Sequence, residues 1–129
     1  MSRYVILEHN YPERHWDLML ECGDVLRTWR LAAPPRPGRP VRAQTSLDHR
    51  LLYLDYEGPV SKGRGRVVRW DSGAFAWLAD ESERVLLRLQ GERCRGAAEL
   101  RRVTPDEWSV TFSEDPGEAS TAPAVSGQK

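Results

Sequence analysis

Residues 15–31, HWDLMLECGDVLRTWRL, decide the fold class. Over His15–Cys22 polar and apolar side chains alternate, which is typical of a β-strand. One face of this strand would carry Trp16, Leu18, Leu20 and Cys22. The opposite face would carry His15, Asp17, Met19 and Glu21. Gly23-Asp24 then predicts a tight turn into a second strand over Val25–Leu31. The stretch therefore predicts an antiparallel hairpin.

Short runs of strand-forming residues lie on both sides of this hairpin. They are Arg3–Glu8, Val41–Thr45, Leu51–Leu54, Arg66–Trp70, Ala74–Leu78, Arg84–Gln90, Ala97–Val103 and Glu107–Phe112. Turn clusters such as Asp71-Ser72-Gly73 separate them, and Ala32–Pro40, with four prolines, predicts an irregular loop. No stretch of a dozen residues shows a helical apolar stripe. The pattern predicts an all-β fold with short loops, a compact antiparallel barrel or sandwich, because closure removes exposed strand edges.

The chain length fits one domain. With 129 residues, it lies within the usual range of roughly 100–150 residues for a single domain. We place the folded unit at residues 1–113. Residues 114–129 are rich in Ser, Gly, Ala, Pro and acidic residues and hold no aromatic residue, so they predict a disordered acidic tail.

Other features of the sequence indicate the cellular compartment in which the protein is expected. No apolar run reaches the roughly 20 residues of a membrane helix, and the first residues do not resemble a signal peptide. The two cysteines, Cys22 and Cys94, form neither a disulfide framework nor a metal knuckle. We expect a cytoplasmic monomer that has reduced thiols and makes no membrane contact.

The charge is balanced overall but unevenly distributed. Nineteen basic and nineteen acidic residues give a net charge of zero, which by itself argues against coating nucleic acid through bulk charge. Residues 27–69, however, carry ten basic against three acidic residues, a net +7. Seventeen of the nineteen basic residues are Arg, which suits forked phosphate contacts. The alternative is Arg scattered over a solvated barrel surface.

Two histidines and one aspartate form a candidate metal site. His15 and Asp17 are two apart on a predicted strand and so share a face. His9 ends the preceding strand and reaches the same point if the loop Asn10–Arg14 folds back. Two imidazoles and a carboxylate suit a first-row divalent metal with open positions for water and substrate. Surface or hydrogen-bonded histidines are the alternative, since Glu21 also lies on this face and a solvated face would look the same.

A second pair could act beside a phosphate. His49 and Tyr53 are four residues apart, which predicts one side of a strand or extended segment. Together they could supply a transition-state donor and a proton source. A structural histidine and a half-buried tyrosine are the alternative.

These residues resemble a known family. Val5–Trp29 resembles the opening of the 3′-phosphoesterase domain of bacterial DNA ligase D, which has a strand, His-x5-His-x-Asp, an alternating strand and a Gly/Asp turn. The resemblance continues to about Phe112, through Leu47–His49, Asp55–Gly58, Val67–Gly73 and Leu87–Gly91.

The resemblance implies a β-barrel with a manganese-type metal centre, zinc or another first-row metal being the alternative. Family members remove a 3′-phosphate or 3′-ribonucleotide from DNA ends, leaving a 3′-hydroxyl, in non-homologous end joining. By position, His9, His15 and Asp17 match the metal ligands. His49 and Tyr53 match residues that act at the scissile phosphate, and Glu21 matches an important acidic residue.

The chain departs from the family at two cation positions and one acidic position. The family has an Arg at Met19, a Lys in the Ala32-Ala33 region and a Glu at Leu47. We predict that phosphate or nucleic-acid contacts come from Arg27, Arg42, Arg64 and Arg66. Four further cations could compensate: Arg30, Arg36, Arg39 and Lys62.

Three functional hypotheses follow. The first is a free-standing, metal-dependent phosphoesterase of DNA 3′ ends in break repair, with a separate ligase or end-joining protein as partner. The second is a non-catalytic module that binds DNA ends or a repair partner, which Met19, Ala33 and Leu47 motivate. The third is a metal phosphoesterase of another substrate, such as a small phosphate ester.

Overall fold

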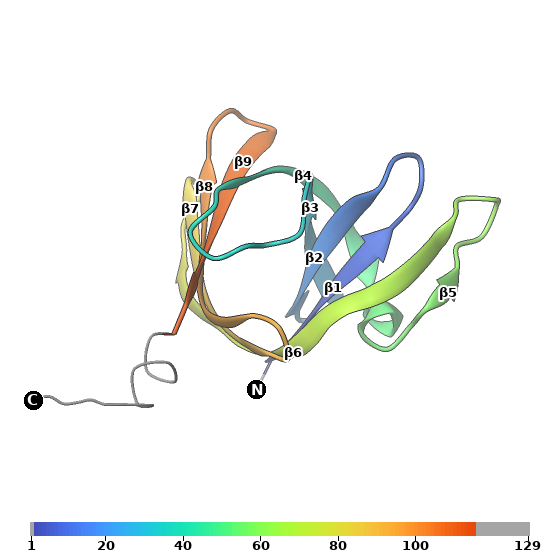
Figure 1. The fold of residues 1–129 in the computed structure, drawn as a ribbon, viewed down its shortest axis with the longest axis horizontal. Coiled ribbons are helices and arrows are strands. Elements are labelled where there is room, and N and C mark those ends of the chain that lie inside the picture. The colour runs from blue at the N-terminus through green and yellow to red at the C-terminus, as the bar shows by residue number, and fades with distance from the viewer. Residues whose placement is uncertain (1, 116–129) are drawn as a thin grey trace, which may run out of the picture.

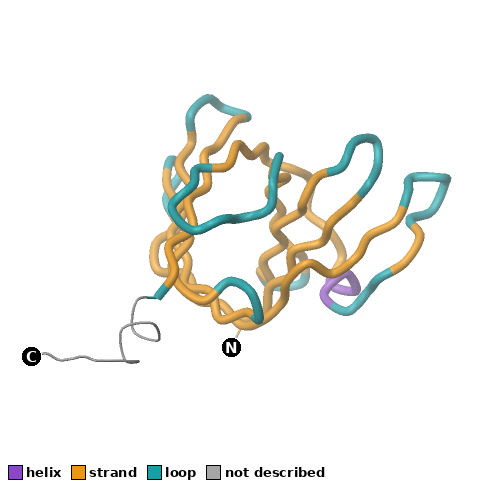
Figure 2. The backbone as a smooth tube through the Cα atoms, viewed as in Figure 1, coloured by secondary structure: helices purple, strands orange, loops and turns teal. Residues whose placement is uncertain are grey.

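The computed structural model describes residues 2–115 and is built from strands (Figures 1 and 2). The strands are β1 (Ser2–His9), β2 (His15–Cys22), β3 (Val25–Leu31), β4 (Val41–Arg50), β5 (Gly58–Pro59), β6 (Arg66–Asp80), β7 (Arg84–Gly91), β8 (Arg95–Arg102) and β9 (Glu107–Glu114). Within the described residues the helical structure is one 3₁₀ turn, η1 (Leu51–Leu54). The all-β prediction is confirmed.

The strands close into an antiparallel barrel. Neighbours follow the order β1-β2-β3-β4-β9-β8-β7-β6, and β6 pairs back with β1. The short β5 adds to β6 outside this ring, on the right in Figure 1. Closure leaves the eight ring strands paired on both sides, so the fold is the predicted barrel and not a sandwich.

The predicted hairpin has the expected bounds. β2 and β3 pair from Trp16 opposite Leu31 to Cys22 opposite Val25, across the turn at Gly23-Asp24. The inward side chains of the two strands are Trp16, Leu18, Leu20, Trp29 and Leu31. In the barrel core they belong to one cluster with Phe75, Leu87, Leu100 and Val110 of β6 to β9. The loop of residues 32–40 then reaches β9, where the Gly38 N–H donates to the Phe112 carbonyl at 2.8 Å (Figure 2).

A second apolar cluster covers the outside of β1, β2 and β3. Its buried members are Val5, Leu7, Met19, Leu26, Leu54 and Val67, with Leu51, Tyr53, Tyr56 and Val60 packed on them. The outer face of β2 is therefore not solvated, and His15 and Asp17 are only 5% and 3% exposed. The packing of residues 51–60 on the outer cluster excludes a fully solvated face at His15 and Asp17. The metal site stays a prediction.

The prediction of a strand over Leu51–Leu54 is wrong, because these residues form η1. A 3₁₀ turn repeats every three residues, so Leu51 and Leu54 lie on one side. Both pack against the outer cluster, which a strand leaving β4 would not allow.

The predicted turn at Asp71-Ser72-Gly73 is also wrong, because β6 runs through it without a break. The Asp71 carboxylate is buried and accepts hydrogen bonds from Tyr4 Oη at 2.5 Å and from the Arg93 and Cys94 N–H groups at 2.8 and 3.1 Å. Gly91 leaves room for this network, since a Cβ there would collide with Tyr4 Oη and the Asp71 carboxylate. Asp71 thus joins β1, β6 and the β7–β8 turn, whereas in the sequence it resembles a turn residue.

The C-terminal boundary differs slightly from the predicted one. β9 continues to Glu114, and the Asp115 N–H donates to the Arg95 carbonyl at 2.9 Å. The predicted disordered tail otherwise lies outside the described residues. No helical segment of residues 2–115 has the length and hydropathy of a membrane span.

The two cysteines should differ sharply in reactivity. Burial, followed by the nearby Asp71 carboxylate, raises the pKa of the Cys94 thiol to about 12, whereas Cys22 is exposed. Since the thiolate is the reactive form, iodoacetamide at pH 8 should modify one thiol of the folded protein and two after unfolding in guanidinium. Intact mass measures this, with Cys22→Ser as a control that should take up no label when folded. Two labels on the folded protein would contradict the burial of Cys94.

Candidate metal centre and phosphate site

The metal-ligand trio is assembled by the β1–β2 ladder. His9 and His15 are directly opposed, and Asp17 follows two residues along β2 on the same face. One possible ligand atom from each of the three lies within 4.8 Å of those of the others. The connecting loop is tied to β6, where Asn10 Oδ1 accepts the Arg66 N–H at 2.8 Å. The loop thus folds back, and His9 lies beside His15 and Asp17.

Each imidazole is oriented by a backbone carbonyl. His9 Nε2 lies 2.7 Å from the Arg64 carbonyl oxygen, and His15 Nδ1 lies 2.8 Å from that of Glu13. A carbonyl oxygen only accepts, so these nitrogens carry the protons. His9 Nδ1 and His15 Nε2 then face Asp17 Oδ2 at 4.0 and 3.2 Å. In a neutral imidazole both present lone pairs, as metal ligation requires.

The Asp17 carboxylate gives a test of whether the site fits a cation. Its Oδ1 is buried and accepts no hydrogen bond, although an unpaired buried carboxylate oxygen is costly. Two lone pairs and a carboxylate that converge repel one another unless a proton or a cation lies between them. The donor set of two imidazole nitrogens and one carboxylate fits a first-row divalent metal with positions left for substrate.

His49 is held by a threonine on the neighbouring strand. Thr28 Oγ1 lies 3.0 Å from both the Leu26 carbonyl oxygen and His49 Nδ1. The hydroxyl has one proton, which it gives to the carbonyl, so its oxygen accepts from His49 Nδ1–H. The other ring nitrogen, Nε2, then carries the lone pair in the neutral imidazole and a second N–H in the protonated one.

Tyr53 comes from η1 and not from a strand shared with His49, which corrects the predicted extended segment. Its ring contacts the His49 ring edge-on, with the two centroids 5.7 Å apart. On its other side it contacts Tyr56 in the same manner, at 5.8 Å. The 3₁₀ turn therefore sets the position of Tyr53 against His49.

One cavity of about 320 Å³ unites these groups. Its lining includes His9 and Asp17 from the trio and His49 and Tyr53 from the second pair. The remaining lining residues are Tyr11, Pro12, Met19, Arg30, Ser46, Leu47, Val60, Arg64 and Val67. A cluster that fits a metal thus shares a cavity with a histidine whose tautomer is fixed.

Comparison with known proteins identifies the family of this chain. The family model of the DNA ligase D 3′-phosphoesterase domain matches residues 7–102, which include every residue that lines the cavity. The chain belongs to the DNA ligase D 3′-phosphoesterase family. The resemblance found in the sequence is therefore confirmed.

The relatives are much longer proteins. The "Multifunctional non-homologous end joining DNA repair protein LigD" of Mycobacterium tuberculosis strain H37Rv is 32% identical over 116 residues, which are 83% of this chain and 15% of the relative. The "Multifunctional non-homologous end joining protein LigD" of Pseudomonas aeruginosa PAO1 is 30% identical over 133 residues, 92% of this chain and 16% of the relative. The chain therefore spans about a sixth of the length of these LigD proteins.

Arg30 is the cation that reaches this LigD-type centre from β3. It stands directly opposite Asp17 in the β2–β3 ladder. Its Nε lies 4.0 Å from Asp17 Oδ1 and, although buried, makes no hydrogen bond. The sequence named Arg30 only as one of several compensating cations. The hairpin register could have singled it out, because pairing Cys22 with Val25 also pairs Asp17 with Arg30.

Arg64 is the one predicted phosphate contact that lines this cavity of the LigD-type domain. Its Nε and Nη2 donate to the carbonyl and hydroxyl oxygens of Ser61 at 2.9 and 3.1 Å. Its own carbonyl accepts from His9, so the residue holds a metal-ligand candidate and brings a positive charge to the cavity.

Two other predicted site residues lie elsewhere in the LigD-type barrel. Glu21, towards the far end of β2, accepts the Arg3 N–H at 2.8 Å. Arg27 donates to Asp80 at 3.0 Å, and its guanidinium lies about 5 Å from the ring centroids of two tryptophans, Trp29 and Trp77. Neither lines the 320 Å³ cavity, so their predicted roles have no geometric support here.

The last two predicted cations are also outside the cavity. Arg42 pairs with Glu107 at 2.7 Å on the outside of β4. Arg66, the first residue of β6, uses its backbone N–H to hold the Asn10 side chain. Arg42 nevertheless lines a neighbouring cavity of the domain.

The departures from the LigD pattern fall around the site. Met19 is buried in the outer apolar cluster and lines the cavity. Leu47 lines it too and is 85% exposed, so its apolar side chain faces solvent. Ala33 lies in the loop after β3 and lines no part of the cavity.

Removing a trio member should abolish tight metal binding. Loss of a residue that only hydrogen-bonds a metal ligand typically lowers metal affinity by roughly 10–100-fold. We expect His15→Ala, which removes a ligand itself, to lower Mn²⁺ affinity by more than this. Calorimetric titration measures this, and His49→Ala is the matched control because it alters a nearby histidine that lines the cavity of His9 and Asp17 but is outside the trio. Unchanged affinity in a folded His15→Ala variant would show that the trio does not bind the ion.

Proposed function

We propose that this protein is a divalent-metal-dependent phosphoesterase that removes a 3′-phosphate or 3′-ribonucleotide from DNA ends, leaving a 3′-hydroxyl. The observation that carries the proposal is the single cavity lined by His9 and Asp17 of the trio, by His49 and by Arg30, with His15 beside them in the trio. The DNA substrate and a separate ligase or end-joining protein as partner rest on the family description and on the end-joining names of the relatives.

The trio would hold the metal, and manganese is the ion we propose. When bound, such an ion supplies Lewis-acid polarisation of a phosphoryl oxygen. His9 and His15 are kept in the ligating tautomer by the carbonyls of Arg64 and Glu13. The site is thus organised by backbone groups before any substrate arrives.

His49 would hold or donate a proton at the phosphate. Thr28 fixes its Nδ1–H, which directs the chemistry to Nε2. The edge-on ring of Tyr53 limits how far the imidazole can turn. A positioned acid or base of this kind is worth about 10²–10⁴-fold in rate.

Arg30 would take the role of the phosphate-binding Arg that the family has at the position of Met19. Its Nε lies 4.0 Å from the Asp17 carboxylate and its side chain is 43% exposed, so a phosphate oxygen at the centre would meet the exposed part of the guanidinium. A charge-assisted hydrogen bond of this type is worth about 1.5–3 kcal/mol. Arg64 adds a second positive charge at the same cavity.

A DNA-end or repair-partner binding module is the second candidate. The observation in its favour is the rim of the cavity, where an apolar Leu47 lies exposed and Met19 offers no charge. Metal binding without turnover on any phosphate ester would favour this candidate. Turnover of small esters but not of DNA ends would favour a phosphoesterase of another substrate.

The direct test uses a primer–template that ends in a 3′-phosphate or a single ribonucleotide, incubated with Mn²⁺. We expect conversion to a 3′-hydroxyl, and a fall of about 10²–10⁴-fold in His49→Ala because the proton donor is lost. Denaturing gels measure the product. Arg101→Ala, on the outside of β8 where Arg101 pairs with Glu99, is the control with unchanged activity. If neither the 3′-phosphate end nor the ribonucleotide end is processed with manganese, zinc or cobalt, the proposed activity is wrong.

Substitution of Arg30 tests the replacement cation. Arg30→Ala should lower kcat/KM by roughly tenfold to a hundredfold, the equivalent of one charge-assisted hydrogen bond. Arg30→Lys should recover part of this loss, since it keeps the charge but not the forked donor. Steady-state kinetics on the 3′-phosphate substrate measure both. Wild-type kinetics in Arg30→Ala would exclude a contact between Arg30 and the phosphate.

A further inference from the structure

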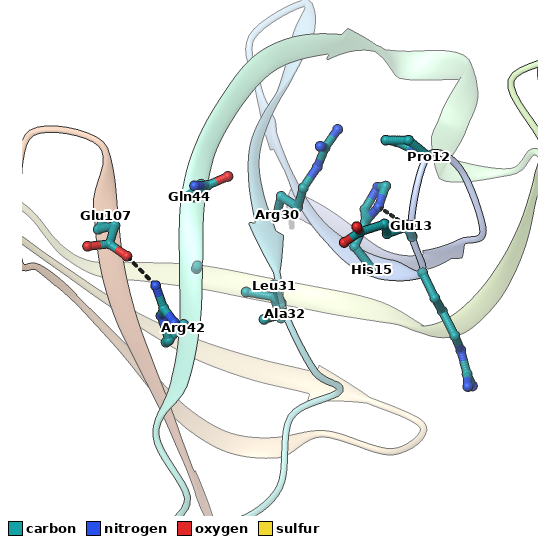
Figure 3. Close-up of a pocket in the computed structure, with 11 residues that line it drawn as sticks. Pro12, Glu13, His15, Arg30, Leu31, Ala32, Arg42, Gln44 and Glu107 are labelled. Carbon is teal, nitrogen blue, oxygen red and sulfur yellow. Dashed lines mark hydrogen bonds and ion pairs between the residues drawn. The ribbon is translucent and has the colours of Figure 1, made fainter.

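We propose that a second cavity, of about 330 Å³ and next to the metal centre, binds the nucleoside that adjoins the phosphate being attacked (Figure 3). The inference rests on the proposed function, because the phosphate at the metal centre fixes where the nucleoside begins. The volume lies in the range of small-molecule sites. The lining residues used below are His15, Arg30, Ala32, Arg42, Gln44 and Glu107.

Strand register connects the two cavities. Asp17, Arg30, Gln44 and Glu107 are directly opposed along β2, β3, β4 and β9. Opposed residues in a sheet share a face, and neighbouring strands lie roughly 4.8 Å apart. Gln44 therefore stands roughly 10 Å from the metal-ligand carboxylate, about two strand spacings away. Arg30 lies between them and lines both cavities.

Gln44 supplies the group that would recognise a base. Figure 3 shows its side chain pointing from β4 towards Arg30, across the cavity from His15. Within residues 2–115 no hydrogen bond occupies its amide, which offers two donors and one acceptor. Such an amide can pair with the edge of a nucleobase. Leu31, Ala32 and Ala43 add apolar surface beside it.

Arg42 supplies a second phosphate contact at the far end of the cavity. Its guanidinium turns towards Glu107 in Figure 3, and the two are 2.7 Å apart. The Arg42 side chain is 85% exposed, and exposed ion pairs contribute little, so a phosphate can displace Glu107 at small cost. A nucleoside in the cavity would thus have one phosphate at the metal centre and the next at Arg42.

This arrangement defines the substrate class as an oligonucleotide. A small phosphate ester reaches only the metal centre and gains nothing from Gln44 or Arg42. A DNA end gains both contacts. The cavity is therefore where the protein would distinguish a DNA end from a free phosphate ester.

The test compares binding with turnover. Fluorescence anisotropy of a labelled primer–template ending in a 3′-phosphate, in EDTA, gives affinity without reaction. We expect Gln44→Ala and Arg42→Ala each to weaken binding by about tenfold, while Arg101→Ala, on β8, leaves it unchanged. A primer with an abasic terminal nucleoside is the matched ligand, on which Gln44→Ala should have no effect. In the presence of Mn²⁺, turnover of p-nitrophenyl phosphate should be equal in wild type and Arg101→Ala.

The outcomes separate this inference from the proposed function. Wild-type affinity in both Gln44→Ala and Arg42→Ala overturns the subsite, whether or not the protein turns over DNA ends. An equal loss for Gln44→Ala on normal and abasic primers overturns base recognition. If no ester or DNA end is turned over while Gln44→Ala still weakens binding selectively, the subsite stands and the phosphoesterase function falls. Gln44 is exposed, so its substitution leaves the core intact.

Discussion

The pairing of β2 with a strand on each side is the constraint on which the site depends. On one side it sets His9 opposite His15, and on the other it sets Arg30 opposite Asp17. A slip of one residue in either ladder would turn the ligands to the opposite face of the sheet. The positions of these groups along the strands therefore come from backbone hydrogen bonds within a closed ring, and the loop carbonyls of Glu13 and Arg64 then orient the two imidazoles.

Burial on both faces of the same strand sharpens the electrostatics. The outer apolar cluster leaves His15 and Asp17 little exposed, and in such surroundings charges interact more strongly than in water. The same surroundings make an unpaired carboxylate oxygen expensive. Among the described residues the buried carboxylate of Asp71 shows the contrast, because both of its oxygens accept hydrogen bonds whereas Asp17 Oδ1 accepts none.

Local pattern predicted the parts of the structure that depend on near neighbours. Alternation and a Gly/Asp turn predicted the β2–β3 hairpin, and the two-residue spacing placed His15 and Asp17 on one face. Three features depend on distant packing, which single-sequence patterns do not report. These are the 3₁₀ turn that positions Tyr53, the passage of β6 through Asp71, and the distance of Glu21 and Arg27 from the cavity.

The hydroxyl of Thr28 has a consequence for the direction of proton movement. Its single proton is committed to the Leu26 carbonyl, so its oxygen can only receive from His49. The imidazole cannot pass a proton into the sheet by this route. Any proton that His49 gains or loses must cross at its other nitrogen, Nε2, in a residue that lines the cavity.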